Sequence, residues 1–102
     1  MKLFQMAHSR AGDKGNTLTL SLIPYQEEDF PWLCEHVTAT KVKKHFGHLA
    51  LSNVQRYELP KISSLLFVCE GALDGGVTTS LSLDPHGKSM SSWLLELEVE
   101  EK

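Results

Sequence analysis

The stretch Ser9-Arg10-Ala11-Gly12-Asp13-Lys14-Gly15-Asn16 lies between two strand-like runs near the start of the chain. Its two glycines are three positions apart, and an acid and a cation stand between them. Glycine permits a positive φ and the close approach of another backbone or of a ligand, and a hairpin turn needs only about two residues. We therefore expect a loop over residues 9–16 that presents its charged groups on a bare backbone.

The segments on either side of this stretch predict the two strands of a hairpin. Residues 2–8 mix apolar and polar side chains on both faces, which fits a strand that is partly covered on both sides. Residues 17–23 alternate strictly, with leucine at every second position and hydroxyl side chains between them. This alternation is typical of a strand with one buried and one wet face.

A helical region follows between Asp29 and Gly47. Asp29 can cap a helix that carries Pro31 in its first turn, and the threonines near residue 40 predict a break or a second capped turn. Val42 and Phe46 are then four positions apart on one helical face. Glycine at position 47 is expected to end this second helix.

The second half of the chain predicts three further strands. Residues 53–59 alternate before a proline, and residues 64–70 are continuously apolar, as in a central strand that is covered on both faces. Residues 77–83 alternate again. Helical spacing then predicts a helix over about 88–97, and a strand over 94–99 is the alternative.

This element order predicts a single domain over residues 1–102, without an internal repeat or a linker-like segment. Two strands, a helical region and more strands form a mainly antiparallel sheet with helices on one face. The expected fold is therefore an α+β, ferredoxin-like two-layer sandwich.

Composition excludes several classes of function. The formal net charge of −3 gives no support to nucleic-acid binding. The longest apolar run, residues 65–69, is far too short to cross a bilayer, and the N-terminus lacks the pattern of a signal peptide. Cys34 and Cys69 lie in apolar neighbourhoods, which favours buried thiols over a catalytic one. We expect a cytoplasmic protein with no membrane partner.

Two later stretches resemble residues 9–16 in composition, namely residues 73–76 and 84–88. We expect these three loops to form one functional rim. The candidate residues for binding a ligand or a partner are Arg10, Gly12, Asp13, Lys14, Gly15, Asn16, Asp74, Gly75, Gly76, Asp84, Gly87 and Lys88.

The chemistry of this rim is open at the level of the sequence. Arg10 with Lys14 offers a grip for a carboxylate or a phosphate, and Asp13 is a candidate acid or base. Aspartate in a glycine-rich turn more often bonds its own backbone. No nucleophile, metal cluster or cofactor motif is recognised, so no catalytic residue, metal or cofactor is assigned.

Five motifs in this order resemble those of the ferredoxin-fold domain of AtuA-like proteins, a family named for acyclic terpene utilisation. They lie at residues 10–17, 31–33, 56–60, 71–77 and 84–88. The resemblance spans nearly the whole chain, and the first and fourth motifs are the specific ones. The family more often has serine where this chain has Ala11, so no role for a hydroxyl is carried over to that position.

The resemblance implies a free-standing small protein that accompanies an AtuA-like large protein. AtuA-like proteins are associated with acyl-CoA carboxylation and with the breakdown of isoprenoid or branched acids. The resemblance also implies an accessory subunit that is not catalytic on its own. The alternative is a stand-alone binder or enzyme for a CoA-linked or carboxylate small molecule. A third possibility is a structural rim in a homo-oligomer, because sheet edges are commonly covered in this way.

Overall fold

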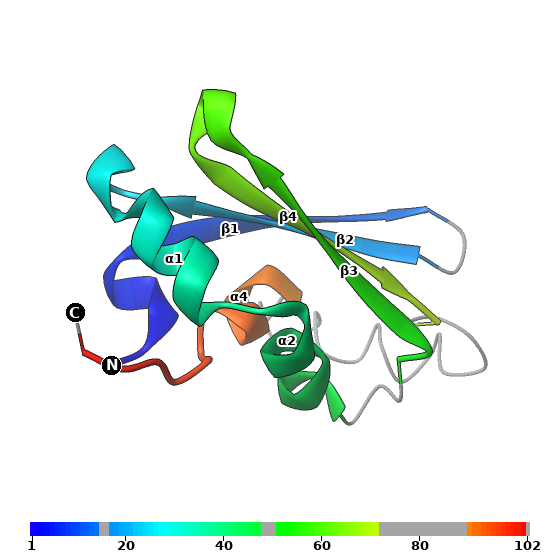
Figure 1. Cartoon of the computed structure of the whole chain (residues 1–102). Coiled ribbons are helices and arrows are strands. Elements are labelled where there is room, and N and C mark those ends of the chain that lie inside the picture. The colour runs from blue at the N-terminus through cyan, green and yellow to red at the C-terminus, as the bar shows by residue number, and fades with distance from the viewer. Residues whose placement is uncertain (15–16, 48–50, 72–89, 102) are drawn as a thin grey trace.

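The computed structural model describes residues 1–14, 17–47, 51–71 and 90–101 (Figure 1). Four strands, three α-helices and three short 3-10 turns make up this part of the chain. In chain order they are η1 (Leu3–Gln5), β1 (Ala7–Lys14), β2 (Thr17–Pro24), η2 (Glu27–Asp29), α1 (Phe30–His36), α2 (Ala39–His45), β3 (Asn53–Leu59), η4 (Pro60–Ile62), β4 (Ser64–Glu70) and α4 (Met90–Leu94).

The sheet has the strand order β1-β2-β4-β3, and all neighbouring strands are antiparallel. The inner strands β2 and β4 supply the core, because buried leucines of β2 stand opposite buried side chains of β4. Leu20 opposite Phe67 is the central pair, and both side chains are fully buried. Figure 1 shows α1, α2 and α4 on the same side of the sheet. The expected α+β two-layer sandwich is thereby confirmed.

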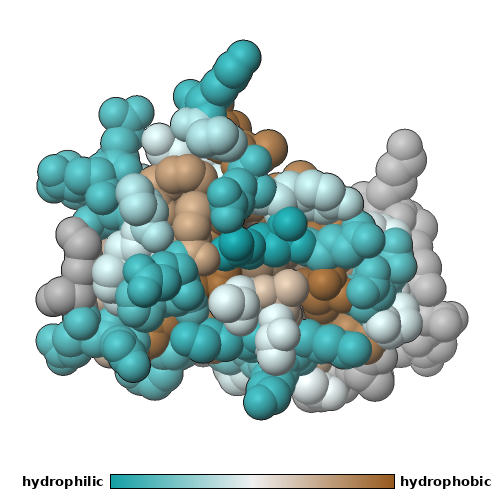
Figure 2. All heavy atoms as spheres, in the orientation of Figure 1, coloured by the Kyte–Doolittle hydropathy of each residue, from teal (hydrophilic) through white to brown (hydrophobic). Residues whose placement is uncertain are grey.

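The helix layer buries one apolar stripe and leaves its other face wet. Leu33, Val37, Val42 and Phe46 are fully buried in the core shared with the sheet. Thr38 separates α1 from α2 and caps α2, since its hydroxyl accepts a hydrogen bond from the Lys41 N–H at 3.2 Å. This confirms the expected second capped turn. Figure 2 shows hydrophilic side chains over most of the surface in this view, with apolar side chains between them.

Arg56 fastens α1 to the sheet. Its position in β3 is opposite Phe67, so its side chain lies on the helix side. One guanidinium nitrogen donates to the Cys34 carbonyl and also, at 3.1 Å, to the Val37 carbonyl. The other terminal nitrogen donates to the Glu58 carboxylate at 2.8 Å. The last carbonyls of a helix have no partner within the helix. A charged donor from the neighbouring strand therefore satisfies the end of α1.

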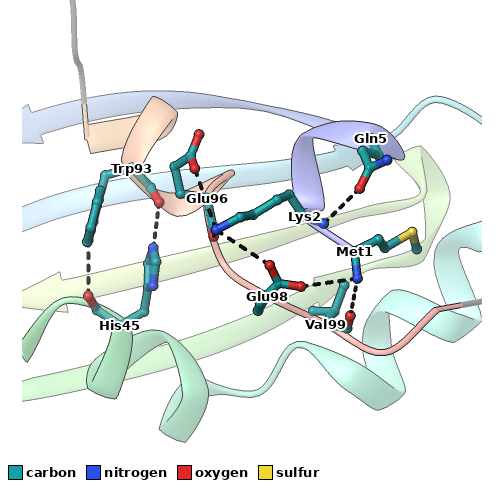
Figure 3. Close-up of polar contacts among 8 residues, drawn as sticks. All are labelled: Met1, Lys2, Gln5, His45, Trp93, Glu96, Glu98 and Val99. Atoms are coloured by element: carbon teal, nitrogen blue, oxygen red, sulfur yellow. Dashed lines mark hydrogen bonds and ion pairs between the residues drawn. The ribbon is translucent and has the colours of Figure 1, made fainter.

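The two ends of the chain run side by side. The Leu3 N–H donates to the Leu97 carbonyl at 3.0 Å, and the Val99 N–H donates to the Met1 carbonyl at 2.8 Å. Around them the Lys2 ammonium lies 3.5 Å from the Glu98 carboxylate (Figure 3). The pKa of Glu98 lies below its ordinary value, mainly because its carboxylate accepts a hydrogen bond from the N-terminal ammonium. The positive charges of that ammonium and of Lys2 lower the pKa further.

A reciprocal contact between His45 and Trp93 joins α2 to α4 (Figure 3). The His45 Nε2 bonds the Trp93 carbonyl, and the Trp93 indole N–H donates to the His45 carbonyl at 3.0 Å. The two rings are stacked with their centroids 4.7 Å apart. This contact ties α4 to the rest of the helix layer.

Two expectations at the ends of the chain need correction. Residues 2–8 do not form one strand, because Leu3–Gln5 makes a 3-10 turn with Leu3 in the core and β1 begins only at Ala7. The alternatives near the C-terminus are both partly right. The helix ends at Leu94 and a turn follows it, and the residues after the turn pair with the N-terminal segment through an isolated bridge between Lys2 and Glu98 and not through a full strand.

Strands 53–59 and 64–70 are confirmed within these bounds, whereas the strand expected at 77–83 lies outside the described residues. No helix in the described part of the chain is long and apolar enough to span a membrane.

The contacts of Arg56 predict a measurable loss of stability. Arg56→Ala removes the donor to two helix-end carbonyls, and we expect the free energy of unfolding to fall by about 1–3 kcal/mol. Glu58→Ala removes only a half-exposed ion-pair partner, and its expected cost is at most about 1 kcal/mol. Urea denaturation of both variants checks this. Equal losses in the two variants would contradict the capping role.

Candidate functional site

The residues of the first motif lie in a strand, so the expectation of a loop over residues 9–16 is wrong. β1 pairs with β2 residue by residue from Ala7 opposite Pro24 to Lys14 opposite Thr17. Only positions 15 and 16 separate the two strands. The small residues and the glycine of this stretch are typical of a loop. They are also compatible with a strand when the paired strand, here β2, carries the larger side chains.

Alternation along β1 sends the motif residues to two different faces. Ser9 and Ala11 are opposite Leu22 and Leu20 of β2, on the side where the helices lie. Arg10 and Gly12 are opposite Ser21 and Thr19, on the face that we call the outer face of the sheet.

Hydroxyl groups of β2 reinforce the pairing with the motif strand. The Ser21 hydroxyl accepts from the Arg10 N–H at 3.1 Å, and the Thr19 hydroxyl donates to the Gly12 carbonyl at 3.2 Å. The backbone groups of Arg10 and Gly12 therefore point toward β2. In an antiparallel pair the direction of these groups alternates, so the N–H and C=O of Ser9 and Ala11 point out of the sheet edge. No described strand pairs with this edge.

Arg10 is the exposed cation of this site. Its side chain lies on the outer face, and within the described residues its guanidinium makes no ion pair. Arg56 is the contrasting case, because its guanidinium is held by helix carbonyls and Glu58. A planar guanidinium that is exposed and unoccupied can take a carboxylate or a phosphate. Arg10 can therefore bind a ligand or a partner, whereas Arg56 holds the fold.

Glycine is required at position 12 because the Thr19 side chain approaches its backbone closely, and not because the backbone there adopts a special conformation. The φ of Gly12 is not positive, unlike that of Gly71. A Cβ at position 12 would lie 3.0 Å from the Thr19 hydroxyl oxygen, which is tighter than ordinary contact. The hydrogen bond of that hydroxyl to the Gly12 carbonyl holds it in place.

The other sequence-predicted site residues can be placed only in part. Asp13 and Lys14 occupy backbone positions opposite Leu18 and Thr17 at the end of β1. The remaining candidates lie outside the described residues, so the convergence of the three loops stays a prediction; they are Gly15, Asn16, Asp74, Gly75, Gly76, Asp84, Gly87 and Lys88.

The sequence prediction missed the apolar part of the outer face. β4 was expected to be covered on both sides, but Leu66 and Val68 are half-buried on a face that no described helix covers. Tyr57 stands beside Leu66 on β3 and is 46% exposed. Its hydroxyl donates to the Gln55 side chain at 2.7 Å, as expected for two residues on the same face. The missing signal was the register, which sequence alone does not give.

The thiols do not point to covalent chemistry. Burial raises the pKa of Cys69 to about 11, and burial is also the main cause that raises the pKa of Cys34. A raised pKa keeps a thiol protonated and weakly nucleophilic at neutral pH. In the part of the chain that the structure describes, no three His, Cys, Asp or Glu side chains gather as metal ligands would.

Fold and site together define a small α+β domain with one helix-covered sheet face, one outer face and an edge strand that carries the first motif. The model of the AtuA ferredoxin-like domain family matches residues 1–100, and the chain belongs to this family. The ferredoxin-like assignment is thereby confirmed. Neither a curated protein nor a solved structure matches the chain.

The contact at Gly12 predicts a specific double-mutant result. Gly12→Ala places a methyl group against the Thr19 hydroxyl, and we expect it to lower the free energy of unfolding by about 1–2 kcal/mol. Adding Thr19→Ala removes the obstructing oxygen, so the double variant should be more stable than the sum of the single losses implies. Thermal unfolding of the four proteins checks this, and strict additivity would refute the steric account.

Proposed function

We propose that this chain is an accessory small subunit of an AtuA-like large protein and contributes no catalytic group of its own. The observation that carries the proposal is family membership over residues 1–100. The proposed setting is the breakdown of acyl-CoA or isoprenoid acids in the cytoplasm, as the family resemblance implies.

The edge of β1 is the proposed contact with the large protein. It belongs to the strand that carries the first family motif, and Ser9 and Ala11 offer N–H and C=O groups there. An extended segment of another protein can add to such an edge as a further strand, in which main-chain hydrogen bonds supply the affinity. Recognition of this kind uses the backbone, so it tolerates the alanine that this chain has at position 11.

A proline at position 11 tests the edge directly. Ala11→Pro removes an N–H that faces outward and leaves the bonds between β1 and β2 in place, which proline permits only on edge strands. We expect the variant to fold but to lose the complex with an AtuA-like large protein of the same organism. Co-expression followed by affinity capture through the small chain measures this, with near-equal recovery expected for the wild type.

Ala11→Ser is the matched control, because it keeps the N–H and places at this position the serine that is more frequent in the family. It should bind the large protein as the wild type does. Circular dichroism must show that Ala11→Pro is folded, and Ser9→Pro, which has the same outward geometry, provides a second test. Normal binding by both folded proline variants would place the contact elsewhere. No complex with the wild-type chain would refute the accessory role itself.

A stand-alone binder of a CoA-linked or carboxylate molecule is the second candidate function. The observation that favours it is the exposed guanidinium of Arg10, which makes no ion pair among the described residues. Lys14 in the same strand is the proposed second cation of the grip. In this function Asp13 is the candidate acid or base.

Calorimetric titration of the isolated protein with acetyl-CoA and a branched-chain acyl-CoA tests this second function. Saturable binding is expected, and Arg10→Ala should weaken it about tenfold or more, a loss of about 1.4 kcal/mol. Lys43→Ala, which removes an exposed lysine of α2, is the charge-matched control and should bind normally. The absence of heat with both ligands would rule this function out.

A further inference from the structure

The register of the four strands orders the outer face into rows that run across the sheet. Each row takes one residue from each strand, in the order β1, β2, β4 and β3. The two central rows are Arg10-Ser21-Leu66-Tyr57 and Gly12-Thr19-Val68-Gln55.

Within the two central rows the outer face has a hydroxyl half at β2 and an apolar half at β4, and on β3 the exposed Gln55 stands beside Tyr57. The β2 half carries Ser21 and Thr19, and the β4 half carries Leu66 and Val68, which do not belong to the core cluster. Tyr57 extends the apolar half on β3 and is 46% exposed. Exposed aromatic side chains beside aliphatic ones are typical of protein interfaces.

We propose that the outer face binds a second copy of this chain, face to face, about a two-fold axis that runs across the strands between the two central rows. Two sheets packed in this way lie about 10 Å apart with interdigitating side chains. This inference goes beyond the proposed accessory function and uses a different surface from the edge of β1.

Self-complementarity of the two rows is what selects a second copy as the occupant. The axis exchanges the rows, so Leu66 meets the partner's Val68 and Ser21 meets the partner's Thr19. Aliphatic side chains of β4 thus contact aliphatic ones, hydroxyls of β2 contact hydroxyls, and Tyr57 meets the partner's Gln55, a side chain that can hydrogen-bond the tyrosine hydroxyl. Arg10 meets the partner's Gly12, a position without a side chain, so the cation of one copy does not face the cation of the other.

The size of the face is sufficient for a weak, specific dimer. Four strands of up to eight residues span about 20 Å by about 25 Å, given the spacing between strands and the rise per residue. This corresponds to about 500 Å² per copy and about 1,000 Å² in total, at the lower limit for a specific interface. A reversible dimer that depends on concentration is therefore expected.

Sedimentation velocity of the purified chain over a range of concentrations tests the proposal. The wild type should pass from monomer to dimer as the concentration rises. Leu66→Glu places a charge at the centre of the interface, and the dissociation constant should rise about tenfold or more. Phe4→Glu is the matched control, because Phe4 is a 49% exposed apolar residue of η1 that does not belong to the four-stranded sheet, and it should dimerise normally.

A second measurement covers the case in which Leu66→Glu fails to fold. Dilution of the wild-type protein should change the methyl NMR signals of Leu66 and Val68 and leave those of the buried Leu33 and Val37 unchanged. A wild-type monomer at all concentrations, or an equal effect of Phe4→Glu, would overturn the proposal. So would protection of these methyl groups only when the AtuA-like large protein is added. Ala11→Pro should still form the dimer, so failure of this proposal can be distinguished from failure of the accessory function.

Discussion

The pairing of β2 with β4 is the constraint on which the rest of this domain depends. Leu18, Leu20 and Leu22 stand opposite Cys69, Phe67 and Leu65, and all six side chains are at most 3% exposed. A shift of one residue in either strand would turn its whole apolar set to the opposite face. Because burial of each leucine is worth about 2 kcal/mol, this register is strongly preferred. The outer-face positions of Ser21 and Thr19 on β2 and of Leu66 and Val68 on β4 follow from it.

The helix layer depends on this sheet and could not form alone. α1 and α2 have seven residues each and α4 has five, whereas isolated helices shorter than about 12 residues are marginal in water. Buried stripes such as Val42 and Phe46 supply most of the attachment. Polar contacts then fix the geometry at particular points, with Arg56 at the end of α1 and the His45–Trp93 contact between α2 and α4. Specific polar groups thus orient helices that hydrophobic burial alone would hold only loosely.

The sequence predicted those elements whose signals are local. Strict alternation specified β2, and the threonine before α2 marked the break between the helices. β1 was mistaken for a loop because Ser9, Ala11 and Gly12 are small and weakly strand-forming. What makes this segment a strand is contributed by β2, through its leucines on one face and the hydroxyls of Ser21 and Thr19 on the other. Such stabilisation from a paired strand cannot be read from the segment itself.

The same reasoning explains which part of the candidate site could be found. Arg10 and Gly12 were recognisable as residue types, but their separation from Ser9 and Ala11 onto different faces follows from pairing. The apolar part of the outer face was not foreseen, because a continuous apolar run such as residues 64–70 suits a strand covered on both sides as well as one with a contact surface. Burial distinguishes the two cases, since Leu65 and Phe67 are fully buried while Leu66 and Val68 are not.

A site built for contact differs physically from one built for chemistry. Catalysis requires groups whose protonation is tuned by their surroundings, and in this chain burial tunes the thiols of Cys34 and Cys69 away from reactivity. The motif strand instead offers an edge with outward backbone groups and a face with an exposed arginine and a glycine. Outward backbone groups can pair with an extended chain, and small side chains allow another surface to approach closely. We therefore propose binding between proteins as the role of the motif, with its edge and its outer face as contacts for separate partners.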